Sequence, residues 1–237
     1  MKKYIISSVA LVIAGTAFLN AEILSEEELL PVNSYVPPVQ SSYVTMEAFY
    51  AGASKDIDKD FGEEVNIGGL WSTFGKKISG TQPGLSLDFA GILAIGGGST
   101  EVDWHGIGTY VEEKYSQFDI FAGGQVALTY EFCESFSLTG GVMAGVDIRS
   151  MEYEVKGTTG LGYIDTDDDD VACGLFYGAF VRADTRLTNR WSLTASLRYM
   201  GTTTENEFSI PVAGVSESWK TEKVGYGVFT LGAKFSF

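Results

Sequence analysis

Five carboxylates lie within six residues in the second half of the chain: Asp165, Asp167, Asp168, Asp169 and Asp170. A hard cation such as Ca²⁺ takes about six to eight oxygen ligands, so the run could supply most of a calcium site. Consecutive residues of an extended segment point to opposite sides, however, and no EF-hand spacing surrounds the run. Calcium binding at these five aspartates is kept as a hypothesis, and no other cofactor is expected.

Acid–base chemistry would have one histidine to work with, His105, in the segment Asp103-Trp104-His105-Gly106. Imidazole titrates near neutral pH, which suits it to proton transfer. No GxSxG elbow, metal-spaced histidine pair or recognisable nucleophile accompanies it. The residue inventory therefore favours a protein that is not an enzyme, with His105 as an ordinary surface residue.

A third group of charged residues is dispersed through stretches that are otherwise apolar on one face. Apolar and polar residues alternate along these stretches with a period of two. Only an extended strand places two such sets of residues on opposite faces. We count eight of them, over residues 42–52, 65–76, 85–95, 117–132, 136–150, 171–187, 191–201 and 223–237. The polar residues that we place on the inward parity are Glu47, Asp88, Gln125, Asp147, Arg149, Arg182, Asp184, Arg198 and Lys234. We assign Glu47, Asp88, Arg182, Asp184 and Arg198 to one network in the lumen.

The last stretch, KVGYGVFTLGAKFSF, shows the pattern most clearly. Its apolar parity carries Phe229, Leu231, Phe235 and Phe237, and the opposite parity carries Lys234. An apolar face opposed to a polar one fits a sheet with lipid outside and water inside. The stretch resembles the carboxy-terminal strand of bacterial outer-membrane β-barrels. That resemblance implies that the four apolar residues form a signal for the barrel-assembly machinery.

The amino-terminal end has the features of an export signal. Lys2 and Lys3 precede an apolar segment over residues 4–18 and a cleavage pattern that ends at Ala21. The segment is shorter than the roughly 20 residues that a membrane-spanning helix needs. We therefore predict a signal peptide over residues 1–21. The acidic, proline-containing segment over residues 22–41 is predicted to be a disordered periplasmic tether. A barrel is predicted over residues 42–237.

The connections between the eight stretches alternate in length. Those after the second, fourth and sixth stretches are short, as periplasmic turns of outer-membrane barrels are, and the others are long. Both termini are then periplasmic. The segment Leu187-Thr188-Asn189-Arg190-Trp191 with the strand after it resembles the last turn and seventh strand of OmpA-like barrels. The resemblance covers residues 42–237 and implies an eight-stranded antiparallel up-and-down transmembrane barrel in a Gram-negative outer membrane, without the peptidoglycan-binding domain of full-length OmpA proteins.

Charge is concentrated in the long connections. The chain has a formal net charge of −15, and residues 53–66, 97–117, 151–170 and 203–223 together hold 20 acidic residues and six lysines. Such a surface does not attract nucleic acid. The expected partners are outer-membrane lipid and lipopolysaccharide, the assembly machinery, and an extracellular ligand or host surface that meets these loops.

An eight-stranded barrel has an interior just wide enough for its side chains. Charges there must be paired, which predicts a closed lumen and a structural or adhesion-like role through the loops. The alternatives are a narrow ion channel and, more distantly, a soluble lipocalin-like barrel that binds an apolar ligand inside. Cys133 and Cys173 are expected at opposite rims and unpaired.

Overall fold

The computed structural model describes residues 41–53, 65–79, 84–106, 109–159, 162–212, 215–221 and 224–237. The predicted signal peptide and nearly all of the predicted tether lie outside the described residues. Within these residues, ten strands follow one another. They are β1 (Ser41–Ala53), β2 (Ile67–Ser79), β3 (Leu85–Gly106), β4 (Thr109–Cys133), β5 (Phe136–Thr159), β6 (Gly162–Arg186), β7 (Trp191–Thr202), β8 (Glu207–Val212), β9 (Val215–Lys220) and β10 (Gly225–Ser236).

Eight of the strands form a closed antiparallel barrel in the order β1-β10-β7-β6-β5-β4-β3-β2, and β8 pairs with β9 as a separate hairpin. The predicted fold class is confirmed. The barrel closes where β1 meets β10, with Met46 opposite Ala233 and Tyr50 opposite Phe229. At the end of this seam, Ser42 and Phe237 exchange two backbone hydrogen bonds of 3.1 and 2.9 Å. The closing strand therefore satisfies the edge that β1 would otherwise leave unpaired.

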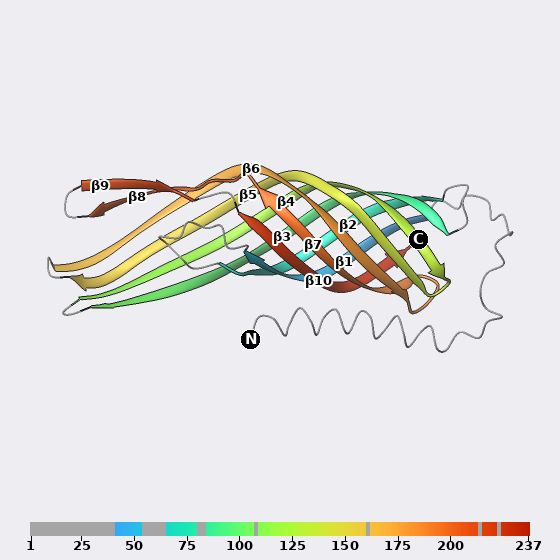
Figure 1. Cartoon of the computed structure of the whole chain (residues 1–237), viewed down its shortest axis with the longest axis horizontal. Coiled ribbons are helices and arrows are strands. Elements are labelled where there is room, and N and C mark those ends of the chain that lie inside the picture. Colours follow the sequence, from blue (N-terminus) through green and yellow to red (C-terminus); the bar gives the residue numbers. More distant parts are fainter. Residues whose placement is uncertain are drawn as a thin grey trace.

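Four strands are much longer than their sequence patterns suggested. β3 to β6 contain 22 to 25 residues each, against 12 or 13 in the other barrel strands. They continue past the barrel as one sheet, which Figure 1 shows projecting beyond β1, β2, β7 and β10. We call residues 98–106, 109–117, 151–159 and 162–170 the extension. The prediction that residues 97–117 and 151–170 are loops was wrong, because their charged residues continue a strand alternation.

Residues 203–223 were also predicted to form a loop, and they instead contain the β8–β9 hairpin. Most of the first long connection, residues 53–66, lies outside the described residues. The three short connections join β2 to β3, β4 to β5 and β6 to β7 at one end of the barrel, which we call the short-turn end. Cys133 in β4 lies at this end, Cys173 lies toward the other end of β6, and both are free thiols.

The outer wall of the barrel is apolar around its circumference. Its exposed side chains come from every barrel strand, and they include Met46, Leu70, Leu93, Val126, Val142, Leu175, Leu197 and Leu231. Aromatic rings gather at the short-turn end, where Trp191 and Phe235 have ring centroids 4.9 Å apart and Phe132 and Phe136 5.8 Å apart. Within the described part of the chain, no helix is long and apolar enough to cross a membrane.

Candidate functional site

The five predicted lumen charges lie inside the barrel and are buried. The Arg198 guanidinium donates to Glu47 at 3.1 Å, and Glu47 also accepts from the Thr230 hydroxyl. Arg182 contacts Asp88 at 3.2 Å and Asp184 at 3.3 Å. The five residues thus form two adjacent groups of ion pairs that cross the lumen between β1, β3, β6 and β7.

Lys234 faces inward, as the alternation of the last strand predicted. Its Nζ lies 2.7 Å from Asp184 Oδ2, so this carboxylate is shared between Lys234 and Arg182. A small polar vestibule of about 190 Å³, lined in part by Lys234 and Asp184, opens at the short-turn end. From the short-turn end inward, the lumen therefore presents Lys234 first and then the ion pairs of Arg182 and Arg198.

Aromatic rings support the arginines. The Tyr43 hydroxyl donates to Asp88 at 2.5 Å, and the Arg182 guanidinium lies 5.2 Å from the centre of the Tyr43 ring. Arg198 lies 4.3 Å from the ring centre of Trp71 and 5.3 Å from that of Phe180. Such cation–π contacts strengthen when they are shielded from water. Tyr43 was not among the predicted lumen residues, although Tyr43 shares the odd-numbered, inward parity of Glu47 in β1.

A layer of aromatic side chains crosses the lumen above these pairs. Ring centroids lie 6.2 Å apart for Phe49 and Trp71, 6.5 Å for Trp71 and Phe121, and 5.6 Å for Phe121 and Phe176. All four side chains are buried, and they come from four different strands, β1, β2, β4 and β6. Two of the three contacts are edge-on and one is stacked, so the rings form a packed apolar layer across the lumen.

A second polar network lies beyond the aromatic layer. Arg149 Nε lies 2.8 Å from Asp119, and Arg149 Nη2 lies 3.3 Å from Asp147 and 3.1 Å from the Tyr226 hydroxyl oxygen. Gln117 donates to both Asp119 and Tyr226. Asp147 and Arg149 were placed inward from the sequence, whereas Asp119 was overlooked, although it shares the inward parity of Gln125 in β4.

The connection after β7 runs over this network. Thr202 and Thr204 donate to Asp147 Oδ2 at 2.9 and 2.7 Å. Asn206 is fully buried, and its amide donates to Asp170 at 3.1 Å. We call residues 202–209 the docked segment. It holds the start of β8 against β6 and is hydrogen-bonded to β5.

The five aspartates of the calcium hypothesis are not brought together. They lie along β6 with alternating exposure, so that Asp165, Asp167 and Asp169 face outward, and Asp168 and Asp170 face the docked segment. Asp170 accepts from the backbone N–H of Glu207 at 3.0 Å, and Asp168 accepts from that of Ser209 at 2.6 Å. The five carboxylates do not share one face, because a strand separates neighbouring side chains onto opposite sides. Calcium binding by this run stays a prediction.

The inner face of the extension has its own apolar core. Met151, Tyr153 and Val155 are buried with Phe208 of the docked segment, and Val111, Tyr115 and Ile164 pack around them. The Tyr115 and Tyr153 rings have centroids 4.5 Å apart, and Tyr153 lies 6.0 Å from Phe208. Burial raises the pKa of the Tyr153 hydroxyl to about 12, and it raises the pKa of Tyr115 still further.

His105 lies at the exposed tip of the β3–β4 hairpin, where its ring centroid is 5.1 Å from that of Tyr110. Asp103 and Glu112 both accept from the Tyr110 hydroxyl, at 3.2 and 3.1 Å. The Glu112 hydrogen bond is the main cause that raises the pKa of Tyr110 to about 12. Glu101, Asp103 and Glu112 offer oxygens within 4.8 Å of one another at this tip. His105 therefore lies beside a tyrosine whose hydroxyl donates to two carboxylates.

Comparisons with known proteins find only distant structural similarities. No family model matches, and no curated protein matches. Among solved structures, Ail, the attachment invasion locus protein of Yersinia pestis, is 14% identical over 84% of this chain and 99% of its own, with a TM-score of 0.44. OprG of Pseudomonas aeruginosa is 13% identical over 83% and 96%, with a TM-score of 0.43. The outer-membrane protease OmpT of Escherichia coli is 8% identical over 87% and 100%, with a TM-score of 0.38.

The chain folds as a closed eight-stranded antiparallel barrel with an apolar outer wall. The eight-stranded antiparallel architecture that the sequence resemblance implied is present in the structure. These similarities are too low to transfer a partner or an activity.

Proposed function

We propose that this protein is an outer-membrane barrel with a closed lumen, both termini in the periplasm, and a structural or adhesion-like role exerted through its extension. The outer wall, with exposed apolar side chains on every barrel strand, supports the membrane location. In this reading β10 presents Phe229, Leu231, Phe235 and Phe237 to lipid and to the assembly machinery.

The observation that carries the proposal is the independent core of the extension. Phe208 is fully buried there together with Met151, Tyr153 and Val155. A sheet with its own core and a docked segment holds its outer face in one conformation, which lowers the entropy lost when a partner binds. The extension is thus a preorganised surface held away from the membrane, and the closed lumen leaves it as the part suited to interaction.

The charge of that surface indicates the chemistry of its partner. Asp165, Asp167 and Asp169 point outward from β6, and Glu152 and Glu154 accompany them on the neighbouring strand β5. Complementary potential steers association, so the fitting partner is a surface rich in lysine or arginine. In this proposal the aspartates act as an acidic face toward a basic partner on another cell or molecule.

Membrane insertion and lumen closure are tested on the same preparation. Fractionated membranes should contain the protein, and unheated samples should migrate faster on a denaturing gel than heated ones. A soluble protein without this shift would contradict the membrane barrel. In planar bilayers the purified barrel should show no steady conductance. Steady conductance that changes in Arg182→Ala would instead establish the narrow-channel alternative.

The interaction role is tested with cells that display the barrel and with beads coated in poly-lysine or poly-glutamate. Cells should bind poly-lysine beads, and the triple variant Asp165→Asn, Asp167→Asn, Asp169→Asn should bind fewer. The matched control neutralises Glu131 and Glu134 at the short-turn end, which we place in the periplasm. Equal binding by the triple variant and the native protein would refute an acidic contact surface.

A further inference from the structure

The short-turn end of the barrel collects cations, although the chain as a whole has a net charge of −15. The charged side chains that line the vestibule there are Lys77, Arg186, Arg190 and Lys234 with Glu131, Glu134 and Asp184. Glu131 already accepts a hydrogen bond from Lys77 at 3.1 Å. Asp184 is shared between Lys234 and Arg182. The vestibule therefore has more cations than carboxylates, which is the reverse of the extension.

Two arginines at the edge of the vestibule carry unpaired charge. Arg186 ends β6, Arg190 directly precedes β7, and both are exposed. Among the described residues, neither guanidinium has an ion pair or a side-chain hydrogen bond. The backbone carbonyl of Arg190 accepts from Ser236 N–H at 2.8 Å, which holds this connection beside β10. A guanidinium has five N–H donors in a planar fork that matches a carboxylate, so the connection offers two binding points for carboxylates.

The vestibule also contains a buried ammonium group. Lys234 is 5% exposed, and its Nζ lies 2.7 Å from Asp184 Oδ2 and 4.6 Å from the centre of the Tyr43 ring. An ammonium group has three N–H donors, of which Asp184 accepts one. The vestibule volume of about 190 Å³ equals that of about six waters. It is therefore large enough for one carboxylate side chain that reaches toward Lys234.

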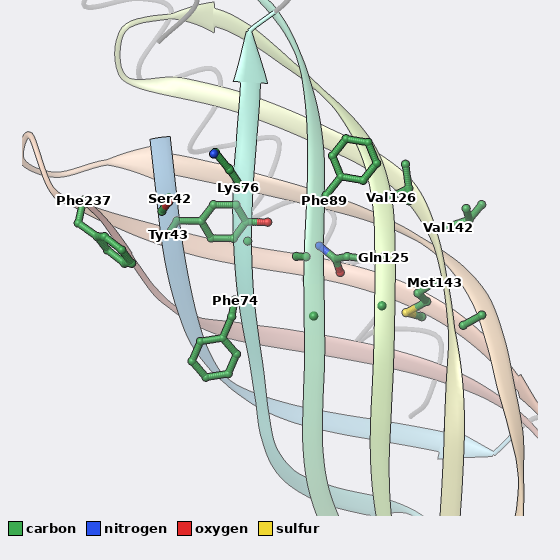
Figure 2. A pocket seen from close by; sticks show the side chains of 15 residues that line it. Ser42, Tyr43, Phe74, Lys76, Phe89, Gln125, Val126, Val142, Met143 and Phe237 are labelled. Atoms are coloured by element: carbon green, nitrogen blue, oxygen red, sulfur yellow. The ribbon is translucent and has the colours of Figure 1, made fainter. Parts of the chain in front are cut away.

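The chain itself enters the barrel at this mouth. Ser41 is the first described residue; it lines the vestibule and lies opposite Lys77 in the register of β1 and β2. Figure 2 shows the next residue, Ser42, with Phe237 on one side and Lys76 of β2 on the other. The segment that precedes Ser41 is therefore joined covalently to the edge of the vestibule.

That segment, residues 22–40, has the opposite charge. It lies outside the described residues, and it contains Glu22, Glu26, Glu27 and Glu28 but no lysine or arginine. The 13 residues from Glu28 to Ser41 can span up to about 45 Å. A ring of eight tilted strands about 4.8 Å apart is only about 16 Å across, so the glutamates can reach any part of the mouth. Covalent attachment by a short linker also gives a local concentration in the millimolar range.

We propose that the vestibule binds the glutamate run at residues 26–28 of the same chain. One glutamate enters the vestibule toward Lys234, and its neighbours pair with Arg186 and Arg190 at the edge. The bound run shields the lower ion pairs of the lumen from water. Neither the proposed membrane location nor the role of the extension is required for this contact, because the chain joins residue 40 to Ser41 in either case.

Cys133 provides a native reporter for the contact, because it lines the vestibule and is a free thiol. The full chain with Cys173→Ser and Ser25→Cys is purified and oxidised mildly. A disulfide between position 25 and Cys133 of one chain should form, and mass spectrometry identifies it. Its rate of formation should be about tenfold higher in 0.1 M than in 1 M NaCl, because the screening length falls from about 10 Å to about 3 Å.

Charge reversal separates binding from random encounter. Arg186→Glu with Arg190→Glu should slow disulfide formation about tenfold in 0.1 M NaCl, because the mouth then repels the glutamates. Adding Glu26→Lys, Glu27→Lys and Glu28→Lys to this variant should restore the native rate, because both partners have then exchanged their charge. The triple reversal alone should be as slow as the arginine variant.

The matched control is Lys114→Glu with Lys156→Glu, which reverses two lysines of the extension and should keep the native rate. Neighbouring charges also alter the reactivity of a thiol. The reaction of Cys133 with a small neutral thiol reagent is therefore measured in each variant without Ser25→Cys, and every rate is divided by this reactivity. The urea transition of each variant, followed by tryptophan fluorescence, establishes that it has folded.

The outcomes are distinguishable. Equal normalised rates for the native mouth and the Arg186→Glu, Arg190→Glu variant would overturn the contact, as would failure of the triple reversal to restore the rate. Either result would leave the membrane barrel intact. Disulfide-linked dimers whose share rises with protein concentration would overturn the contact within one chain in favour of a second copy. A soluble protein that shows the expected rates would contradict the membrane location alone.

Discussion

Strands β3 to β6 run through both the barrel and the extension, and the polarity of their inward and outward faces differs between the two regions. In the barrel part of β5, Val142, Val146 and Ile148 face outward while Asp147 and Arg149 are buried. Beyond Ser150 the same inner parity carries Met151, Tyr153 and Val155, and the outer parity carries Glu152 and Glu154. The same residues of the alternation face inward in both regions, but the apolar side chains lie outward in the barrel and inward in the extension. In the proposed membrane barrel, this exchange marks the level at which the surroundings change from lipid to water.

The two regions therefore depend on different forces. The lumen is held by buried ion pairs and aromatic rings, which are sensitive to loss of one partner because the other charge stays buried. The extension is held by apolar packing and by hydrogen bonds from the docked segment, as in a soluble protein. Substitutions in each region should show this difference, and their expected effects decrease in the order given below.

Arg182→Ala should have the largest effect. It leaves Asp88 and Asp184 buried with one cation fewer, and breaking such a group lowers the free energy of unfolding by about 3–5 kcal/mol. The measurement is urea denaturation of the vesicle-inserted barrel, followed by heat-modifiable gel mobility. The matched control is Lys156→Ala, which removes an exposed pair with Glu154 in the extension and should leave the transition unchanged. Similar transitions for the two variants would contradict the contrast between the regions.

Phe208→Ala should release the docked segment without unfolding the barrel. The side chain is fully buried against Tyr153, and its truncation should weaken docking by about 3 kcal/mol. Limited proteolysis of residues 203–220 should become faster while the urea transition of the barrel stays in place. A simultaneous shift of the barrel transition would show that the extension and the barrel fold as one unit.

Asp170→Asn should weaken the same docking by about 1–2 kcal/mol, since a charged acceptor for Glu207 N–H and the Asn206 amide becomes neutral. Hydrogen exchange at the Glu207 amide reports the change. Asp169→Asn is the control, because that carboxylate faces outward from the neighbouring position on β6. Faster exchange in the Asp169 variant alone would contradict the assignment of faces along the aspartate run.

Alkaline pH should loosen the extension by the smallest amount. Burial raises the folded pKa of Tyr153 to about 12, above the value of about 10 for an exposed tyrosine. The stabilisation is complete below pH 10 and is lost as pH rises through about 12, because ionisation is then favoured in the unfolded extension. Tyrosinate absorbance and proteolysis of residues 203–220 should change together over this range. The Tyr153→Phe variant should remove the Tyr153 contribution to the pH dependence.

Much of the barrel could be predicted from the sequence because the two faces of each strand meet different surroundings, so that alternate residues differ in polarity. The alternation placed Glu47, Asp88 and Lys234 inward without any structure, and the same rule applied to β1 and β4 would have added Tyr43 and Asp119. The extension was missed for a different reason. Acidic composition was taken as the mark of a loop, although Glu152 and Glu154 alternate with Met151, Tyr153 and Val155.

The sequence by itself determined the strands of the barrel, the direction of their faces and the apolar character of the outer wall, because these follow from a period of two. Only the tertiary structure decided which partners meet. The pairing of Arg198 with Glu47, the aromatic layer from Phe49 to Phe176 and the capture of Asn206 by Asp170 join residues far apart in the chain. Barrel closure and strand register bring these residues together, and no local sequence pattern specifies which distant residues become partners.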